Sequence, residues 1–283
     1  MNENRMDSLV STDWLATHLD APDIRIVDAT WFMPSAMRDA RAEYAAAHIP
    51  GAVYFDIDEI ADTTRDLPHM LPSPEKFSSR VRRLGLGDGV RIVVYDQGAW
   101  MAAPRVWWMF RAFGHEDIAV LDGGLAKWRA EERVVDDHVV MPRERHFTAR
   151  LNTFLLRDLD QMRANLETGR ELVIDVRAPG RFAGTAPEPR EGLRSGHIPG
   201  SRNLPFVDLI DPETGRLLAP ERLRPLFDEV GIAPGQAVVA TCGSGVTTGV
   251  LALALHVAGY GDAAVYDGSW TEWGGRDDTP IEP

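Results

Sequence analysis

Apolar residues along the chain follow two spacings that alternate from one end to the other. Short runs rich in β-branched residues are typical of buried strands. We expect such strands at 24–28, 91–95, 118–121, 172–176, 237–241 and 263–266. Stretches with helical spacing separate them, and we expect helices at 38–47, 73–84, 103–113, 126–133, 221–230 and 248–258. Strands that alternate with helices predict an α/β fold with mainly parallel sheets, flanked by helices on both faces.

The order of elements occurs twice, and so do short motifs. The motif His48-Ile49-Pro50-Gly51 recurs as His197-Ile198-Pro199-Gly200, and Leu121-Asp122-Gly123-Gly124 recurs as Tyr266-Asp267-Gly268-Ser269. The spacing between copies drifts by only a few residues, as insertions in surface loops would produce. Repeated motifs in the same order indicate a duplicated domain of ordinary size. We expect one domain at 1–135, a linker at 136–153 and a second domain at 154–283.

Composition narrows the class of protein. A chain of 283 residues with 44% hydrophobic and 26% charged residues is an ordinary globular protein, long enough for two domains. The net charge of −13 argues against non-specific binding to nucleic acid or to an anionic membrane. A single cysteine excludes an internal disulfide and fits a reducing compartment. The polar start lacks a signal peptide's apolar core, so we expect a cytoplasmic enzyme.

That single cysteine has the most distinctive surroundings in the chain. Cys242 follows the expected strand 237–241, and a loop with Gly243 and Gly245 leads into the apolar helix. Glycines let successive N–H groups turn inward around the sulfur, and the helix adds the positive end of its dipole. A lone cysteine is usually a small buried hydrophobe. The position after a strand and before a glycine-rich turn instead favours an ionised, nucleophilic thiolate.

The two copies differ at this position. Alignment of Val93-Val94-Tyr95-Asp96 with Val239-Ala240-Thr241-Cys242 places Asp96 where the cysteine stands. A carboxylate cannot attack sulfur as a thiolate does. We therefore expect the first domain to be a non-catalytic scaffold and the chemistry to lie in the second.

The tandem His-Ile-Pro-Gly motifs, with the loop Cys242-Gly243-Ser244-Gly245-Val246-Thr247 in the second copy only, resemble the two-domain rhodanese superfamily of sulfurtransferases. The resemblance implies two tandem rhodanese-like domains. The loop is most similar to that of 3-mercaptopyruvate sulfurtransferases. Thiosulfate sulfurtransferases typically carry basic residues just after the cysteine, where this chain has Gly243 and Ser244. Thiosulfate is a dianion and benefits from added positive charge, so the neutral loop favours mercaptopyruvate.

The resemblance also implies a reaction. Cys242 would attack the sulfur of 3-mercaptopyruvate, form a persulfide and release pyruvate. A thiol acceptor or cyanide would then take the outer sulfur, without a cofactor. Because the chain has no second cysteine, the acceptor must be external, such as thioredoxin or a small thiol.

Further site residues follow from the resemblance one at a time. Arg181 and Arg190 match the family's two substrate-binding arginines, whose ordinary alternative is solvated surface charge. Asp58 and His69 match an acidic residue and a histidine brought to the site. Outside such a site, Asp58 would be a loop or capping residue, and His69 would be a structural histidine. Ser244 could relay a proton or merely form a turn. We expect the loop residues Gly243, Gly245, Val246 and Thr247 to contact the substrate and the sulfur.

Other readings stay open at this point. Cysteine phosphatases need an arginine in the loop, and residues 243–256 contain neither Arg nor Lys, which argues against that activity. A thiosulfate sulfurtransferase and a non-catalytic persulfide carrier are the remaining alternatives. His48 and His197 occur in both copies, so we expect them to be structural. The histidines show no metal-ligand spacing, and we expect no metal.

Overall fold

The computed structural model describes residues 6–98 and 100–283 of the chain. By its internal contacts it divides into two compact units. Unit 1 comprises residues up to Ala61, Pro72–Asn152 and Pro212–Leu217. Unit 2 comprises Asp62–Leu71, Thr153–Asp211 and Leu218–Pro283. Two short segments therefore belong to the unit formed mainly by the other repeat.

Each unit contains one five-stranded sheet within its described residues, and every pairing in both sheets is parallel. In unit 1 the strand order is β1 (Leu9–Val10), β5 (Ile118–Leu121), β4 (Arg91–Tyr95), β2 (Ile24–Asp28) and β3 (Ala52–Tyr54). In unit 2 it is β6 (Leu156–Arg157), β10 (Ala264–Tyr266), β9 (Val238–Thr241), β7 (Leu172–Asp175) and β8 (Arg202–Asn203). The second order repeats the first strand for strand. The expected α/β fold, with two repeated domains built on parallel sheets, is confirmed.

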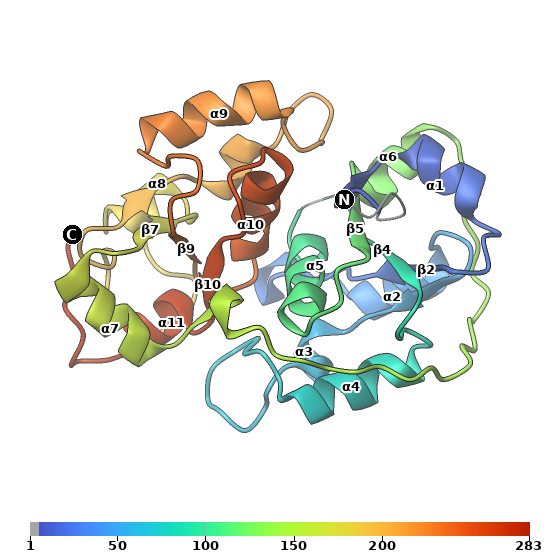
Figure 1. Ribbon diagram of the computed structural model, residues 1–283, viewed down its shortest axis with the longest axis horizontal. Coiled ribbons are helices and arrows are strands. Elements are labelled where there is room, and N and C mark those ends of the chain that lie inside the picture. The colour runs from blue at the N-terminus through green and yellow to red at the C-terminus, as the bar shows by residue number, and fades with distance from the viewer. Residues whose placement is uncertain (1–5, 99) are drawn as a thin grey trace. The chain divides into compact units, whose positions relative to one another are not determined.

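The helices of unit 1 cover both faces of its sheet (Figure 1). They are α1 (Thr12–His18), α2 (Ala40–Ala46), α3 (Ile57–Ile60), α4 (Pro74–Arg83), α5 (Ala103–Ala112) and α6 (Gly124–Ala130). One face packs Leu15 of α1 and Trp128 of α6 against buried residues of β2 and β4. The other carries a cluster of phenylalanine rings, in which Phe77 of α4 stacks on Phe113 at 4.2 Å between ring centroids. Burial on both faces explains why the strands are apolar runs rather than alternating sequences.

Unit 2 repeats this layered arrangement with α7 (Leu159–Thr168), α8 (Pro179–Phe182), α9 (Pro220–Glu229), α10 (Thr248–Val257) and α11 (Ser269–Trp273). Helices α7 and α11 cover one face of the sheet, while α9 and α10 cover the other (Figure 1). Met162 of α7 and Trp270 and Trp273 of α11 belong to one buried cluster. Helix α10 is buried from Thr248 to Leu255, as its apolar sequence predicts.

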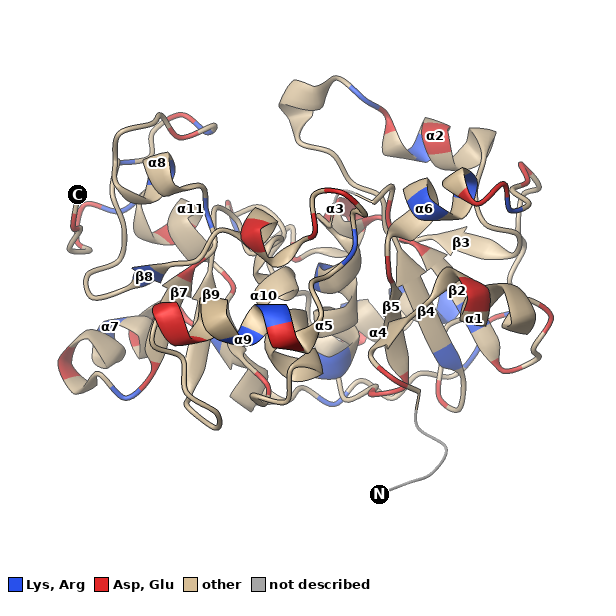
Figure 2. Cartoon of the chain, turned by 90° about the horizontal axis from the view of Figure 1, so that it is seen from above, with Lys and Arg blue, Asp and Glu red and all other residues tan. Residues whose placement is uncertain are grey.

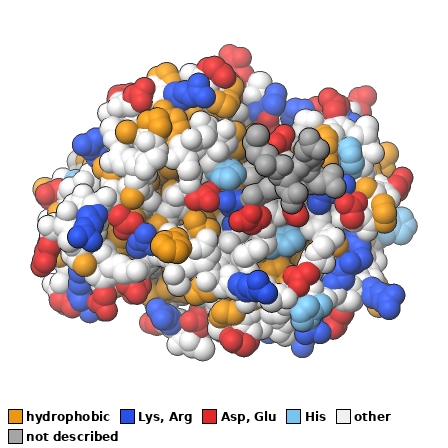
Figure 3. Space-filling model, viewed as in Figure 1, with side chains coloured by type: hydrophobic (Ala, Val, Ile, Leu, Met, Phe, Trp, Pro, Cys, Tyr) orange, Lys and Arg blue, Asp and Glu red, His pale blue; other side chains and the backbone are white. Residues whose placement is uncertain are grey.

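Short 3-10 turns complete the chain at Pro34–Ala36, Thr153–Leu155 and Phe206–Leu209. Lys and Arg are interspersed with Asp and Glu along the helices and loops of each unit (Figure 2). On the face drawn in Figure 3, hydrophobic side chains lie in small groups between charged ones. No described helix is long and apolar enough to cross a bilayer.

Candidate active site

Cys242 lies where β9 ends, at the carboxyl edge of the unit 2 sheet. Thr241, the last residue of β9, pairs with Asp175 of β7, and the carbonyl of Cys242 accepts the N–H of Trp270 at 3.0 Å. The cysteine is only 3% exposed. Ligands of open parallel sheets bind outside the carboxyl ends of the strands, so the sulfur occupies the edge at which such sites form.

The loop after Cys242 presents a donor to the sulfur. The backbone N–H of Gly245 donates to Sγ of Cys242 with 3.2 Å between nitrogen and sulfur. Gly245 has φ +79°, a left-handed conformation that favours glycine. The loop continues into α10, where the hydroxyl of Thr248 donates to the carbonyl of Gly245 at 2.7 Å. The loop thus directs one main-chain N–H group at the sulfur of Cys242.

A second contact fixes the other side of the cysteine, and sequence reasoning missed it. The hydroxyl of Ser269 accepts the N–H of Cys242 at 3.2 Å and donates to the carbonyl of Tyr266 at 2.8 Å. Ser269 is fully buried and has φ 48°, which is uncommon for a residue with a side chain. In the first repeat this position is Gly124, with φ +58°. In the sequence, the one sign of this contact was that the second repeat has Ser269 where the first has Gly124.

The equivalent loop of unit 1, which follows β4, holds a negatively charged side chain. Tyr95 pairs with Asp28 as Thr241 pairs with Asp175, so Asp96 occupies the position of Cys242. The Asp96 carboxylate accepts backbone N–H groups from Gly98 at 2.9 Å and from Met101, Ala102 and Ala103 at 3.0, 3.3 and 3.2 Å. The turn thus gathers main-chain donors around a negative group, and in unit 1 that group is its own carboxylate.

Arg181 lies directly beside the cysteine loop. A Cβ atom added to Gly243 would come within 3.0 Å of Nη2 of Arg181, so glycine leaves room for this guanidinium. Gly243 was expected to need a glycine-only backbone conformation, yet it is absent from the positive-φ residues. At this position the expectation was wrong, and the missing side chain instead leaves space beside the Arg181 guanidinium.

A buried carboxylate, also missed from sequence, holds Arg181 in place. Glu188 accepts Nη2 of Arg181 at 2.5 Å and Nη1 of Arg177 at 2.7 Å, and its side chain is 3% exposed. Arg177 also pairs with Asp175 at 2.6 Å and stacks over Trp270 at 4.4 Å. Two carboxylates and two guanidiniums balance, which lets this network stay buried.

Arg190 and His69 lie together in unit 2. Nη2 of Arg190 is 3.5 Å from Nε2 of His69. His69 is 8% exposed and has φ 59°. It comes from the segment 62–71, which the Asp267 carboxylate anchors by accepting the N–H of Leu71 at 2.6 Å. The structure thus places a histidine from the first half of the sequence beside an arginine from the second.

The remaining expected residues lie as follows. Ser244 and Val246 are 7% and 2% exposed, and Thr247 is half-buried at the start of α10. Asp58 is exposed on α3 of unit 1, where its carboxylate accepts Nε1 of Trp31 at 2.9 Å. Its role toward Cys242 stays a prediction.

The repeated histidines have matching structural contacts. His48 forms an antiparallel bridge with Asp136, and His197 forms one with Glu282. Nδ1 of His48 lies 2.8 Å from the carbonyl of Tyr44, and Nδ1 of His197 lies 2.9 Å from that of Phe182. In each unit the histidine thus pairs with the segment that follows a late helix, α6 in unit 1 and α11 in unit 2. Among the described residues, no three or more His, Cys, Asp or Glu side chains are clustered so that they could hold a metal ion.

Comparison with known proteins agrees with this geometry. The family model described as "Rhodanese-like domain" matches residues 11–131 and again 158–276. The chain belongs to the rhodanese-like family. Each match contains one of the two equivalent turns, the first with Asp96 and the second with Cys242.

Several relatives of this rhodanese-like chain are similar over nearly their whole length. The human 3-mercaptopyruvate sulfurtransferase is 44% identical, with 94% of this chain and 91% of the relative covered. The Escherichia coli K12 protein of the same name is 41% identical, with 97% of each covered. The mouse thiosulfate sulfurtransferase is also 44% identical, with 94% and 91% covered. The crystal structure of SseA from Escherichia coli, a 3-mercaptopyruvate sulfotransferase, superposes with a TM-score of 0.85 at 37% identity, covering 94% of this chain and 99% of SseA.

Proposed function

We propose that this chain is a sulfurtransferase that takes sulfur from 3-mercaptopyruvate onto Cys242 and passes it to an external acceptor. The observation that carries the proposal is the cysteine at the end of β9, with the Gly245 N–H donated to its sulfur and Arg181 packed at Gly243. Relatives at 41% and 44% identity bear the name of this activity.

In the first step the Cys242 thiolate attacks the sulfur of the donor. The new S–S bond forms as the bond between that sulfur and C3 of the donor breaks. The electron pair of the broken bond passes to the carbon as the enolate of pyruvate. The enolate takes up a proton at C3 and leaves as pyruvate, while Cys242 retains the persulfide. We assign this proton delivery to Ser244 and His69, with Asp58 as the acidic group that the family resemblance adds.

Arg181 and Arg190 are proposed to bind the donor. A guanidinium fork matches a planar carboxylate, and two arginines can hold the carboxylate and the keto oxygen at once. Polarisation of the keto oxygen stabilises the enolate, because negative charge develops there as the C–S bond breaks. Gly243, Gly245, Val246 and Thr247 would shape the loop against the donor.

In the second step an acceptor thiolate attacks the outer sulfur of the persulfide. The acceptor leaves with that sulfur, and the Cys242 thiolate is restored. With one cysteine in the chain, the acceptor must come from outside, and we propose thioredoxin, a small thiol or cyanide. A reducing compartment such as the cytoplasm would supply such thiols, and we place the protein there.

Thiosulfate is the competing donor, because a thiosulfate sulfurtransferase is as similar to this chain as the human mercaptopyruvate enzyme is. We base the choice of mercaptopyruvate over thiosulfate on the loop that follows Cys242. Gly243 and Ser244 add no positive charge beside the sulfur, which disfavours a dianion such as thiosulfate.

Steady-state assays with both donors, on the wild type and Cys242→Ser, test the assignment. We expect a higher kcat/KM for mercaptopyruvate and no turnover by Cys242→Ser with either donor. A clear preference for thiosulfate would overturn the donor. Tight binding of a partner protein without release of pyruvate would favour the non-catalytic carrier instead.

A further inference from the structure

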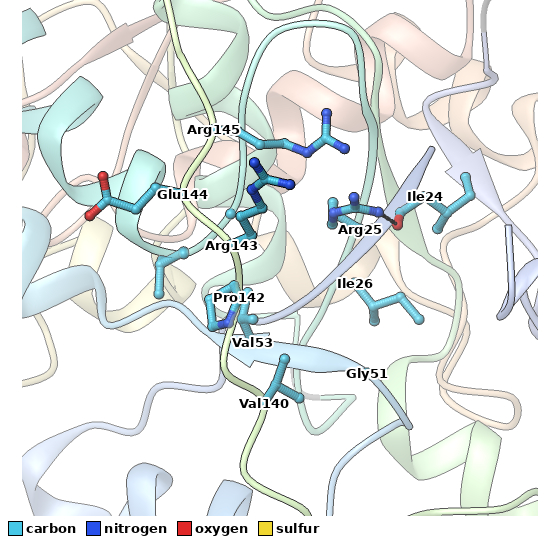
Figure 4. A pocket seen from close by; sticks show the side chains of 12 residues that line it. Ile24, Arg25, Ile26, Gly51, Val53, Val140, Pro142, Arg143, Glu144 and Arg145 are labelled. Atoms are coloured by element: carbon cyan, nitrogen blue, oxygen red, sulfur yellow. Dashed lines mark hydrogen bonds between the residues drawn. The ribbon is translucent and has the colours of Figure 1, made fainter. Parts of the chain in front are cut away.

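Unit 1 contains a cavity of about 650 Å³, a volume typical of small-molecule sites. It lies between the start of β2 and the segment 140–145, and its lining residues all belong to unit 1. Figure 4 shows the guanidinium groups of Arg25, Arg143 and Arg145 directed into the same space. Glu144, between the last two in sequence, points the other way.

The three arginines have no carboxylate partner among the described residues. Nη1 of Arg25 donates to the carbonyls of Pro22 and Ile24 at 3.0 and 2.5 Å. The nearby carboxylate of Asp23 is bonded to Arg91 at 2.8 Å. Burial and, secondarily, the neighbouring charge of Arg145 lower the pKa of Arg25 below its usual value. Like charges that converge repel each other, so an anion bound among the three guanidiniums would relieve that repulsion.

The backbone that carries Arg143 and Arg145 is held closely against the turn before β4. A Cβ atom at Gly85 would come within 2.8 Å of Cβ of Pro142, and one at Gly87 within 2.3 Å of the His146 carbonyl. The N–H of Asp88 donates to that same carbonyl at 2.8 Å. These glycines let the two segments touch. The arginines are therefore presented from a fixed backbone, which reduces the entropy lost when a ligand binds.

We propose that this pocket binds a small phosphate-bearing molecule with at least two negative charges. Three guanidiniums exceed what one carboxylate can neutralise, and the planar fork of arginine matches phosphate oxygens. Apolar atoms of Val53, Val140 and Pro142 line the same cavity and can contact the organic part of the molecule. The ligand is bound by residues outside the sulfur-transfer site, so this site is independent of the proposed function.

Isothermal titration of the full-length protein with inorganic pyrophosphate at low ionic strength tests the proposal. We expect saturable binding to the wild type and at least about a tenfold loss of affinity in Arg143→Gln/Arg145→Gln, since hydrogen bonds to charged groups are the strong ones. Arg150→Gln is the matched control, an exposed arginine of unit 1 outside the pocket, and it should bind as the wild type does. Acetate, with one charge, should bind far more weakly.

Pyrophosphate could also contact the arginines near Cys242, so Arg190→Gln is measured in parallel. Retained affinity in Arg190→Gln, with loss in the double variant, supports the pocket. Binding that disappears in Arg190→Gln but persists in the double variant would overturn the proposal. An absence of saturable binding to the wild type would overturn it as well. Turnover of mercaptopyruvate by the double variant should equal that of the wild type, which shows that the variant is folded.

Discussion

Ser269 shows at the scale of one residue how the repeat that contains Cys242 departs from the first repeat. The first repeat places Gly124 at the left-handed position after β5, whereas the second places a buried serine there. A side chain in this conformation costs about 1 to 3 kcal/mol and persists only where surrounding contacts compensate. The compensation is the hydroxyl, which accepts the N–H of Cys242. The hydrogen bond to this hydroxyl therefore fixes the cysteine's main chain.

Two substitutions of Ser269 separate the effect of the backbone strain from that of the hydrogen bond to Cys242. Ser269→Ala keeps the strain but loses the acceptor, so the free energy of unfolding should fall by about 1 to 3 kcal/mol. Ser269→Gly relieves the strain and should lose less stability. Both should lower kcat, because the loop then holds Sγ less firmly. Urea unfolding and pyruvate release measure the two effects, and full kcat in either variant would count against this role.

Glu188 is the second residue whose role depends on its partners. Its buried carboxylate is shared by Arg177 and Arg181. In Glu188→Gln the charge that holds Arg181 beside Gly243 is lost, so the KM for mercaptopyruvate should rise by about fivefold or more, with a smaller change in kcat. Glu191→Gln, an exposed neighbour, is the control. Equal KM values for the two variants would remove Glu188 from substrate positioning.

At the scale of elements, the strand–turn–helix unit is common to both repeats and differs in what fills it. The turn after β4 donates four main-chain N–H groups to the Asp96 carboxylate, and the turn after β9 donates the Gly245 N–H to the Cys242 sulfur. Each turn leads into a ten-residue helix, α5 in unit 1 and α10 in unit 2, whose N-terminus carries the positive end of the helix dipole. The same turn is thus a stabilising cap in one unit and a proposed reactive centre in the other.

Removal of the Asp96 carboxylate tests the capping role. Asp96→Ala leaves several buried N–H groups at the start of α5 without their acceptor, so the free energy of unfolding should fall by about 2 kcal/mol or more. Asp137→Ala, which alters an exposed carboxylate of unit 1, should change it little. Chemical unfolding compares the two variants. Equal stability would show that Asp96 does not hold this turn.

His115, just after α5, should make unit 1 sensitive to acid. Its ring lies 5.7 Å from that of Phe110 and 5.9 Å from that of Phe147. Burial lowers the pKa of His115 below its ordinary value of 6.5. The unfolded chain therefore takes up this proton at a higher pH than the folded chain. The stabilisation is complete above about pH 6.5 and declines as the pH falls toward the lowered folded value.

The measurement is the free energy of unfolding between pH 7.5 and 5.0 for the wild type and His115→Phe. The variant keeps a ring at this position but cannot titrate, so it should lose less stability on acidification. The difference between the two curves isolates His115 from the other histidines. Parallel curves would exclude it as a source of acid sensitivity.

At the scale of the whole molecule, the duplication was the most informative feature of the sequence. It correctly predicted two units with parallel sheets, because long apolar runs and repeated motifs survive in one sequence. Strands β1, β6 and β8 span two residues each, too few to show a spacing. Helix α7 went unnoticed, although Asp158 and Gln161 form a capping box at its start.

The candidate site was predicted less completely, for physical reasons. Cys242 and Arg181 were expected and lie beside the same loop. The roles of Ser269 and Glu188 depend on tertiary contacts that no local spacing encodes. The placement of His69 in unit 2 depends on where a chain segment crosses between units. Such features follow from the fold and not from a motif.

The most direct test of the account is a single-turnover reaction. The full-length protein is mixed with 3-mercaptopyruvate without an acceptor, and pyruvate and the intact protein mass are measured together. The account predicts one equivalent of pyruvate and one added sulfur atom, located on Cys242 by peptide mapping and absent in Cys242→Ser. Pyruvate release by Cys242→Ser, or by the wild type without sulfur added to Cys242, would contradict it.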